Sequence, residues 1–366
     1  MDNHSSNDND EARMQRCLHL AQKALGQTAP NPMVGAVVVK AGEVVGEGFH
    51  PGAGQPHAEV FALRAAGDRA NQSTVYVNLE PCNHYGRTPP CSEALIKAGV
   101  ARVVVGMVDP DPRVAGSGIA RLREAGIEVT VGVKEADCQR LNEAFVHRIT
   151  HHRPFGILKY AMTLDGKIAT TSGHSAWVTS PAARHQVHHL RAACDAVIVG
   201  GNTVRKDNPL LSTHGVSHHN PLRVVMSRTL NLSEQAQLWD TTAIPTTIFT
   251  EQEGHPEQQR SLQAQGVEVV KIPNLTPDKV MANLYDRGCS SVLWECGGTL
   301  AAQAIADGAV QKVLAFIAPK IIGGHQAPGP VGDLALERMD NAIVLNRLSL
   351  EQVGPDYLLS GYIHRN

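Results

Sequence analysis

The fold of the N-terminal half is decided by two neighbouring segments, GQPHAEVFALRAAG (Gly54–Gly67) and STVYVNLEPCNHYGRTPPC (Ser73–Cys91). Apolar residues recur at helical intervals after His57, which predicts a helix that begins at this residue. The run from Thr74 to Leu79 alternates and is rich in β-branched residues, as strands are. A second helix is expected to begin at the last cysteine, directly after two prolines. Two helix starts and one strand end are therefore expected to converge.

The same segments carry a set of metal ligands. One imidazole (His57) and two thiols (Cys82 and Cys91) suit zinc, with the fourth position left open for water. Glu59 stands beside them, where a carboxylate can move the protons of a water whose pKa the metal lowers to ~7. Each residue alone is more simply explained as buried and reduced. The four together, in the order H-x-E and then P-C…C, are typical of zinc deaminases that act on nucleobases.

The segment NHYGRTPP, which separates the two cysteines, is longer than the C-x-x-C of other zinc deaminases. With NPMVG (Asn31–Gly35) and GFH (Gly48–His50), the motif PCNHYGRTPPC resembles the deaminase half of the bifunctional deaminase/reductases of riboflavin biosynthesis. The resemblance implies a cytidine-deaminase-like domain. The candidate polar contacts to a pyrimidine phosphate, each of which could instead simply be solvated, are Asn31, His50, His84 and Arg87.

Length and composition limit the other possibilities. A chain of 366 residues exceeds one core, so two domains are expected. A net charge of −2 without a basic stripe argues against a polynucleotide substrate, and no apolar run approaches the ~20 residues of a membrane span. Seven cysteines without a disulfide pattern favour the cytoplasm. The polar, acidic N-terminus is unlike a signal peptide, and residues 1–12 are expected to be a disordered tail.

Further elements follow in chain order. A helix over Met14–Leu25 and a hairpin over residues 34–50 are expected to precede the zinc segments, and strands alternate with helices after them. This alternation predicts a three-layer α/β/α domain over residues 13–150. A helical connector ends at Arg153-Pro154, and a second α/β domain is expected over residues 153–366. Within it, Gly297-Gly298 lies between a buried strand and a helix, where backbone N–H groups can bind phosphate. A tight turn explains this pair equally well, and G-x-G-x-x-G is absent.

Four motifs extend the resemblance into the second half: KYAMTLDGKIA (Lys159–Ala169), HSAWVTS (His174–Ser180), DAVIVGGNTV (Asp195–Val204) and WECGGTLA (Trp294–Ala301). They resemble the reductase half of the same family, which implies a dihydrofolate-reductase-like domain that uses NADPH. The cofactor contacts that the resemblance implies are Ala161, Trp177, Thr203, Asp207, Gly297, Gly298, Thr299 and Leu300. The substrate contacts that it implies are Ser175, Arg191, Leu211, His214 and Glu295. Core packing is the other explanation for the tryptophan.

The resemblance implies two consecutive steps on a small molecule. The first is zinc-dependent hydrolytic deamination of 2,5-diamino-6-ribosylamino-4(3H)-pyrimidinone 5′-phosphate, and the second is NADPH-dependent reduction of the ribosyl group to ribityl. Three departures from the family's pattern bear on the second step: His214 replaces an arginine, Asn208 an acid, and Ser227-Arg228 a D-S pair. A deaminase whose second domain only binds nucleotide or supports an oligomer is the alternative. A tRNA-adenosine or free-nucleotide deaminase is disfavoured by the long insertion, and a homo-oligomer stays open.

Overall fold

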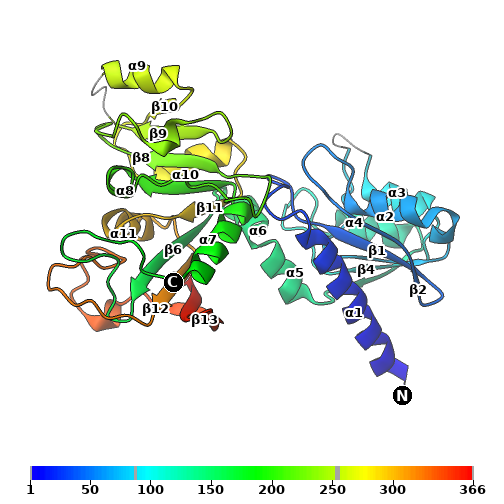
Figure 1. Cartoon of the computed structure of the whole chain (residues 1–366). Coiled ribbons are helices and arrows are strands. Elements are labelled where there is room, and N and C mark those ends of the chain that lie inside the picture. The colour runs from blue at the N-terminus through cyan, green and yellow to red at the C-terminus, as the bar shows by residue number, and fades with distance from the viewer. Residues whose placement is uncertain (1, 86–88, 252–255, 365–366) are drawn as a thin grey trace. The chain divides into compact units, whose positions relative to one another are not determined.

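The computed structural model describes residues 2–85, 89–251 and 256–364 of the chain. The chain forms two compact units, Met1–His152 and Arg153–Asn366 (Figure 1). The division falls at the Arg153-Pro154 break that was expected to separate two domains. Among the described residues, no helix is both long and apolar enough to cross a membrane.

The first unit contains a five-stranded sheet in the order β2-β1-β3-β4-β5. Strand β1 is antiparallel to β2 and β3, whereas β3, β4 and β5 are parallel to one another. The strands are β1 (Gly35–Lys40), β2 (Glu43–Phe49), β3 (Thr74–Val77), β4 (Arg102–Val105) and β5 (Glu128–Val131). The helices are α1 (Asp2–Gln22), α2 (Ala58–Ala66), the 3₁₀ helix η1 (Gly67–Ala70), α3 (Cys91–Lys97), α4 (Ser117–Glu124), α5 (Glu135–Leu141) and α6 (Glu143–His151).

Two glycines show how helices cover both faces of this sheet. A Cβ on Gly35 would lie 2.1 Å from the Cys17 carbonyl oxygen of α1, and one on Gly48 would lie 2.5 Å from the Ala58 carbonyl oxygen of α2. Gly48 pairs in register with Ala36, the neighbour of Gly35. Since neighbouring strand residues point to opposite faces, α1 and α2 pack on opposite faces. The three-layer α/β/α architecture expected from the sequence is confirmed.

Helix α1 begins much earlier than the sequence indicated. The expected disordered tail is wrong for residues 2–12, which belong to this helix. The physical reason is a long-range contact of Asp10, which is buried. Its carboxylate accepts hydrogen bonds from the Tyr76 hydroxyl (2.7 Å) and from the Arg102 guanidinium (3.1 and 2.7 Å). The acidic composition of the segment gave no sign of these partners.

The second unit is a nine-stranded sheet in the order β10-β9-β8-β7-β11-β6-β12-β14-β13. Neighbouring strands from β10 to β12 in this order are parallel to each other, whereas β14 is antiparallel to both of its neighbours, β12 and β13. The strands are β6 (Phe155–Thr163), β7 (Ala196–Gly200), β8 (Leu222–Met226), β9 (Thr246–Thr250), β10 (Glu268–Lys271), β11 (Ser291–Trp294), β12 (Lys312–Ala318), β13 (Leu345–Val353) and β14 (Asp356–Ile363). The helices are α7 (Pro181–Ala193), α8 (Gly201–Asp207), η2 (Gln237–Trp239), α9 (Pro256–Ala264), α10 (Pro277–Asp286), α11 (Gly298–Ala306) and η3 (Met339–Asn341).

Alternate residues of the central strands enter two different core clusters. Ile198 and Trp294 pack with residues of α10 and α11, whereas Val197 and Leu293 pack with residues of α8 and α9. Both faces of the parallel sheet are therefore covered, and the α/β architecture expected for this half is confirmed. Helices α8 and α9 and strand β10 were not predicted. Around α9 the sequence is polar, and Leu262 is the buried residue of that helix.

Candidate functional sites

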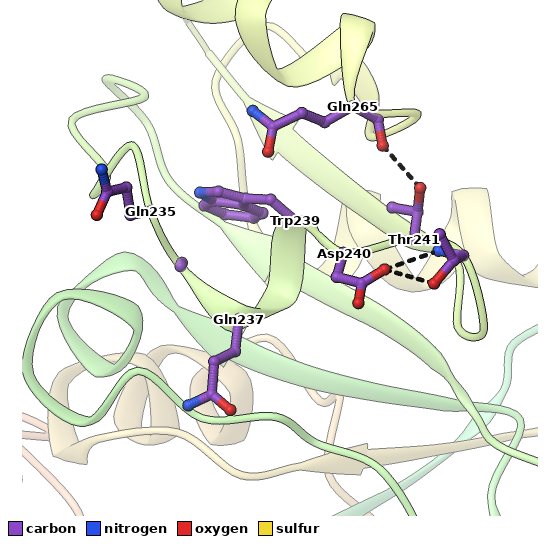
Figure 2. Close-up of a pocket in the computed structure, with 8 residues that line it drawn as sticks. Gln235, Gln237, Trp239, Asp240, Thr241 and Gln265 are labelled. Carbon is purple, nitrogen blue, oxygen red and sulfur yellow. Dashed lines mark hydrogen bonds between the residues drawn. The ribbon is translucent and has the colours of Figure 1, made fainter.

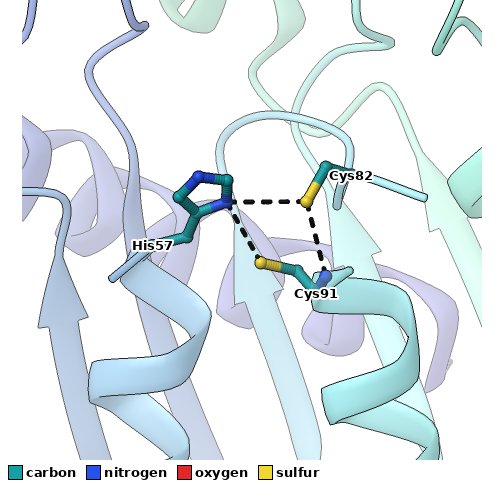
Figure 3. Close-up of side chains that lie close together, drawn as sticks. All are labelled: His57, Cys82 and Cys91. Carbon is teal, nitrogen blue, oxygen red and sulfur yellow. Dashed lines mark hydrogen bonds between the residues drawn. The ribbon is translucent and has the colours of Figure 1, made fainter. Parts of the chain in front are cut away.

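Three side chains from three different elements converge in the first unit (Figure 3). His57 caps the N-terminus of α2, Cys82 follows β3, and Cys91 is the first residue of α3. The His57 Nδ1 atom lies 3.5 Å from the Cys82 sulfur and 3.3 Å from the Cys91 sulfur. All three ligand atoms lie within 4.8 Å of one another, a spacing that one ion can bridge. Two sulfurs and one imidazole nitrogen fit zinc with one position left open.

Glu59 adds a buried carboxylate beside these ligands. Glu59 is 3% exposed, and among the described residues its Oε2 atom has no hydrogen-bond partner. Burial, reinforced by the negative charge of Cys82, raises the pKa of Glu59 to about 7. Buried polar atoms without partners are rare and costly, so this oxygen is expected to face a ligand. A carboxyl with a pKa near neutrality is suited to accepting and returning a proton.

The two thiols of the site differ in acidity. A hydrogen bond from the Cys91 thiol lowers the pKa of Cys82, while burial opposes that shift. The Cys91 backbone N–H also donates to the Cys82 sulfur at 3.4 Å. The same thiol–thiol hydrogen bond and burial raise the pKa of Cys91. Cys82 is therefore the first of the two to become a thiolate. Binding of a cation would favour deprotonation of Cys91 as well.

Asn31 and His50 lie next to the ligands. The His50 ring packs edge-on against His57, with centroids 5.4 Å apart. Its Nδ1 lies 3.1 Å from the Pro56 carbonyl oxygen, so this nitrogen carries the proton and donates. The Asn31 amide nitrogen then donates to Nε2 at 3.1 Å. Burial lowers the pKa of His50, which keeps the ring neutral. His50 thus lies beside a metal ligand and Asn31 beside His50.

The remaining predicted contacts of the first site are less closely placed. His84 is exposed and acts electrostatically on Asp109 and Asp111. Arg87 lies outside the described residues. Sequence reasoning missed Glu80, whose buried carboxylate accepts hydrogen bonds from the backbone N–H groups of residues 109, 116, 118 and 119 at 2.9 to 3.2 Å. Glu80 thus fixes the loop after β4 beside the strand end that carries Cys82.

A charged triad marks the second unit, where the carboxyl end of β11 meets the middle of β6. Arg191 of α7 donates from Nε and Nη2 to the two oxygens of Glu295, at 2.6 and 3.0 Å. Lys159 of β6 donates to the same carboxylate at 3.2 Å. Burial would raise the pKa of Glu295, but the charges of Arg191 and Lys159 outweigh it and lower the pKa to about 2. Lys159 opens the KYAMTLDGKIA motif, but the sequence did not predict it as a site residue.

The two glycines before α11 differ in their surroundings. Gly297 caps the helix with φ −74°, and a Cβ there would have no heavy atom of another described residue within 4 Å. At Gly298 a Cβ would lie 2.9 Å from the Gly329 carbonyl oxygen and 3.1 Å from the Gly332 nitrogen. Gly298 is therefore required by packing of the 329–332 loop, whereas the position of Gly297 is open. Thr299 is exposed, and Leu300 packs partly against the core.

The structure places the other predicted cofactor contacts on β6, on α8 and in the segment before α7. Trp177 is 68% exposed and stacks on the Arg184 guanidinium at 4.5 Å, so core packing does not explain it. Asp207, at the end of α8, accepts a hydrogen bond from Ser175 at 3.3 Å. The two remaining predicted residues are half-buried and lie on β6 and α8: Ala161 and Thr203.

The loop after α8 carries two of the departures from the expected pattern. Asn208 adopts the left-handed conformation (φ 40°), which asparagine tolerates better than most residues, and its side chain accepts from the Gln237 N–H at 2.8 Å. His214 is exposed and stacks on His188 of α7, with ring centroids 4.2 Å apart. Leu211 is 2% exposed in the core, so its main chain is the part that can reach a ligand.

The third departure has a backbone role at the end of β8. The Ser227 N–H donates to the Phe249 carbonyl at 3.0 Å, and the Arg228 carbonyl accepts from the Thr250 hydroxyl at 3.1 Å.

A hollow of about 480 Å³ lies beside Trp239 in the second unit (Figure 2). Two of its polar side chains are bonded to each other, since Asp240 accepts from Thr242. Of the predicted site residues that the structure describes, none lines this hollow.

Two family models match the chain. The model of the cytidine and deoxycytidylate deaminase zinc-binding region matches residues 7–107, and that of the RibD C-terminal domain matches residues 154–359. The riboflavin biosynthesis protein RibD of Synechocystis sp. is 62% identical over 357 residues, which cover 98% of this chain and 97% of that protein. The RibD protein of Escherichia coli is 39% identical over 381 residues, covering 96% and 98%.

Solved structures agree along the whole chain. Acinetobacter baumannii RibD (form 1) superposes with a TM-score of 0.88 at 37% identity, covering 98% of this chain and 100% of that one. A diaminohydroxyphosphoribosylaminopyrimidine deaminase/5-amino-6-(5-phosphoribosylamino)uracil reductase from Thermotoga maritima superposes with a TM-score of 0.86 at 35% identity, with the same coverage. The similarity therefore includes both units.

Proposed function

Because this chain belongs to the RibD family of riboflavin biosynthesis proteins, we propose that each of its two units holds one active site of a two-step reaction. The chain is a bifunctional enzyme, with a zinc-dependent deaminase domain and an NADPH-dependent reductase domain. The proposed substrate of the first step is 2,5-diamino-6-ribosylamino-4(3H)-pyrimidinone 5′-phosphate. The proposed second step reduces the ribosyl group of the deaminated product to ribityl.

The first step is assigned to His57, Cys82, Cys91 and Glu59. When bound, zinc acidifies a water and NADPH supplies a hydride. Glu59 takes a proton from the attacking water and returns it to the amino group that leaves as ammonia, so that protons balance. The observation that carries this assignment is the buried, unpartnered Glu59 oxygen beside three converging ligand atoms. Asn31 and His50, bonded to each other beside His57, are proposed to hold the pyrimidine; His84 and Arg87 are further proposed contacts.

The second step is assigned to the carboxyl edge of the nine-stranded sheet. Gly297, Gly298 and the first N–H groups of α11 at Thr299 and Leu300 are proposed to hold the cofactor's pyrophosphate, which a helix N-terminus favours. The other proposed cofactor contacts are Ala161, Trp177, Thr203 and Asp207. The proposed substrate contacts are Ser175, Arg191, Leu211, His214 and Glu295. The Arg191–Glu295 ion pair supports a role for Glu295 as an ionised acceptor for sugar hydroxyls.

The two steps can be tested separately on the full chain. Without NADPH, the diaminopyrimidine substrate should release ammonia and accumulate the deaminated intermediate. That intermediate, supplied alone with NADPH, should oxidise about one equivalent of cofactor per ribityl product formed, since one hydride is transferred. Ammonia release without any NADPH oxidation would instead support the alternative in which the second unit is impaired. Within the described residues, no observation favours that alternative.

A homo-oligomer and a cytoplasmic location are also proposed. Strand β13 is a nine-residue sheet edge with Leu348 and Leu350 exposed by 61% and 65%. By contrast, the edge strands β5 and β10 have four residues each and begin with a glutamate. Long apolar edges attract other chains, so a second copy is the proposed partner. The seven cysteines, all within the described residues, form no disulfide, which suits a reducing compartment. With a net charge of −2, no nucleic-acid partner is proposed.

A further inference from the structure

Two histidines from different segments stack beside the charged triad of the second unit. The ring of His188 on α7 lies against the ring of His214, with centroids 4.2 Å apart and planes at 23°. Helix α7 holds His188 in a fixed position, because Ala183 and Val187 of the same helix are buried in the core. His214 stands in an exposed loop with a left-handed backbone (φ 48°).

The loop backbone is fixed, so the stack decides where the His214 ring points. The Thr213 N–H donates to the Asn220 side chain at 2.8 Å, and the Thr213 hydroxyl donates to the Ser217 carbonyl at 3.0 Å. The His214 N–H donates to the Ser212 hydroxyl at 3.3 Å. These hydrogen bonds fix the main chain of the loop but do not involve the His214 imidazole, so the orientation of the ring depends on its packing. An aromatic partner at 4.2 Å restricts its rotamers.

Arg191 is largely engaged elsewhere. Its Nε and Nη2 atoms donate to Glu295, and Nη1 donates to the Ser212 carbonyl at 3.0 Å. A guanidinium fork that already holds a carboxylate has no bidentate face left for a phosphate. In the part of the chain that the structure describes, the His214 imidazole makes no hydrogen bond, so it can donate to a ligand next to the same positive charge.

We propose that His188 is a positioning residue for the reductase, whose ring holds His214 toward the phosphate end of the ribosyl substrate. This inference rests on the proposed function of the second unit. It adds a residue that the resemblance does not include, and it explains how a histidine can serve where an arginine was expected. The pair takes up one proton as the phosphate binds, because a neutral ring stacked on an imidazolium stabilises it through its π face.

The groups around the pair support uptake of one proton and oppose a second. Arg191 and His185 of α7 and Glu295 after β11 act on His188, and Lys159 stands behind Glu295. Burial first, and then the charges of His214 and Arg191, lower the pKa of His188 to about 4, and burial and Arg191 lower that of His214. Both rings are thus neutral near pH 7. A phosphate dianion reverses that balance for one ring, as an opposite charge within a few ångströms favours the charged form.

The test uses the full chain, the deaminated intermediate and NADPH, with steady-state reduction measured at pH 7. His188→Ala should raise the KM for the intermediate about tenfold, the loss expected for one charge-assisted hydrogen bond, while kcat stays within about twofold. His188→Phe keeps an aromatic face under His214 and should retain the wild-type KM. Deamination by both variants should match wild type, which controls for folding.

Three outcomes separate the inference from the function beneath it. A wild-type KM in His188→Ala, or an equal loss in His188→Phe and His188→Ala, overturns the positioning role. If His214→Ala also leaves the KM unchanged, the substrate does not reach the stack and the proposed contact at His214 fails with it. If the wild-type chain itself reduces nothing, the proposed function fails, and the stack plays no part in that result.

Discussion

Arg191 and Glu295 face each other as a bidentate ion pair, with N–O distances of 2.6 and 3.0 Å, at the end of a buried strand. The pair joins α7 to β11, and Lys159 extends it to β6. Each partner needs the others, since an isolated charge at this depth is costly. The site and the stability of the second unit therefore depend on the same carboxylate.

Replacing that carboxylate should destabilise the second unit. Glu295→Gln leaves Arg191 and Lys159 without their counter-charge, and breaking a buried pair costs ~3–5 kcal/mol. Urea unfolding at pH 7, followed by tryptophan fluorescence, measures the loss, and deamination serves as the control for the first unit. Wild-type stability in Glu295→Gln would contradict the buried ion pair.

The effect of Glu295 on stability should depend on pH in one direction. The folded pKa of about 2 lies below the ordinary 4.5, so the stabilisation is complete above pH 4.5 and is lost as the pH falls through 2. The difference in unfolding free energy between wild type and Glu295→Gln should therefore shrink between these pH values. A difference that grew on acidification would refute the assignment.

The first unit should hold about one equivalent of zinc per chain, as a site with three converging protein ligands does. Cys91→Ser removes one thiolate and should lower the bound metal, measured by elemental analysis. A chelator should abolish deamination of the diaminopyrimidine and leave reduction of the supplied intermediate intact. Cys289→Ser, at a buried cysteine of the second unit, is the matched control and should keep its zinc.

Glu59→Gln should keep the metal and slow deamination by at least ~10²-fold, the scale of general acid–base catalysis. The amide has nearly the shape of the carboxylate but cannot accept the proton from water. Ammonia release, with zinc content measured on the same sample, decides the matter. Deamination at the wild-type rate by a zinc-loaded Glu59→Gln chain would rule out this role.

Gly297 is the better position for probing the cofactor's phosphates. Gly297→Asp places a negative charge at the N-terminus of α11, at a position where a Cβ stands in open space, and should raise the KM for NADPH about tenfold or more by charge repulsion. Gly297→Ala is the matched control and should stay near wild type. An equal effect of both, or of neither, would show that the pyrophosphate lies elsewhere.

Gly298 would not discriminate. Any side chain there meets the main chain of residues 329 and 332, so a loss of activity would report a displaced loop. Gly298→Ala should lower thermal stability and impair reduction together. Improved or unchanged stability in this variant would contradict the close packing.

The convergence of the three candidate metal ligands could be predicted from the sequence, because each ligand stands at the boundary of a helix or strand. His57 and Cys91 follow prolines and begin helices, and Cys82 follows a strand. Contacts between distant segments could not be predicted in the same way. The Asp10–Arg102 ion pair, which extends α1 into the expected tail, joins residues 92 positions apart.

The second site shows the same limit. Its residue types were predictable, but Lys159 as partner of Glu295 and His188 as partner of His214 depend on how β6, β11 and α7 meet. Equally, two adjacent glycines look identical in sequence, and the loop at 329–332 alone distinguishes them. Residues whose role is set by tertiary packing carry no local signal.

Because of the exposed edge at β13, the thermal stability of the second unit should depend on the protein concentration as well as on the sequence. If a second copy covers Leu348 and Leu350, association and folding are linked by mass action. Diluting the protein should then lower the melting temperature of the second unit and leave that of the first unchanged. An enzyme with such an edge is most heat-resistant where it is most abundant.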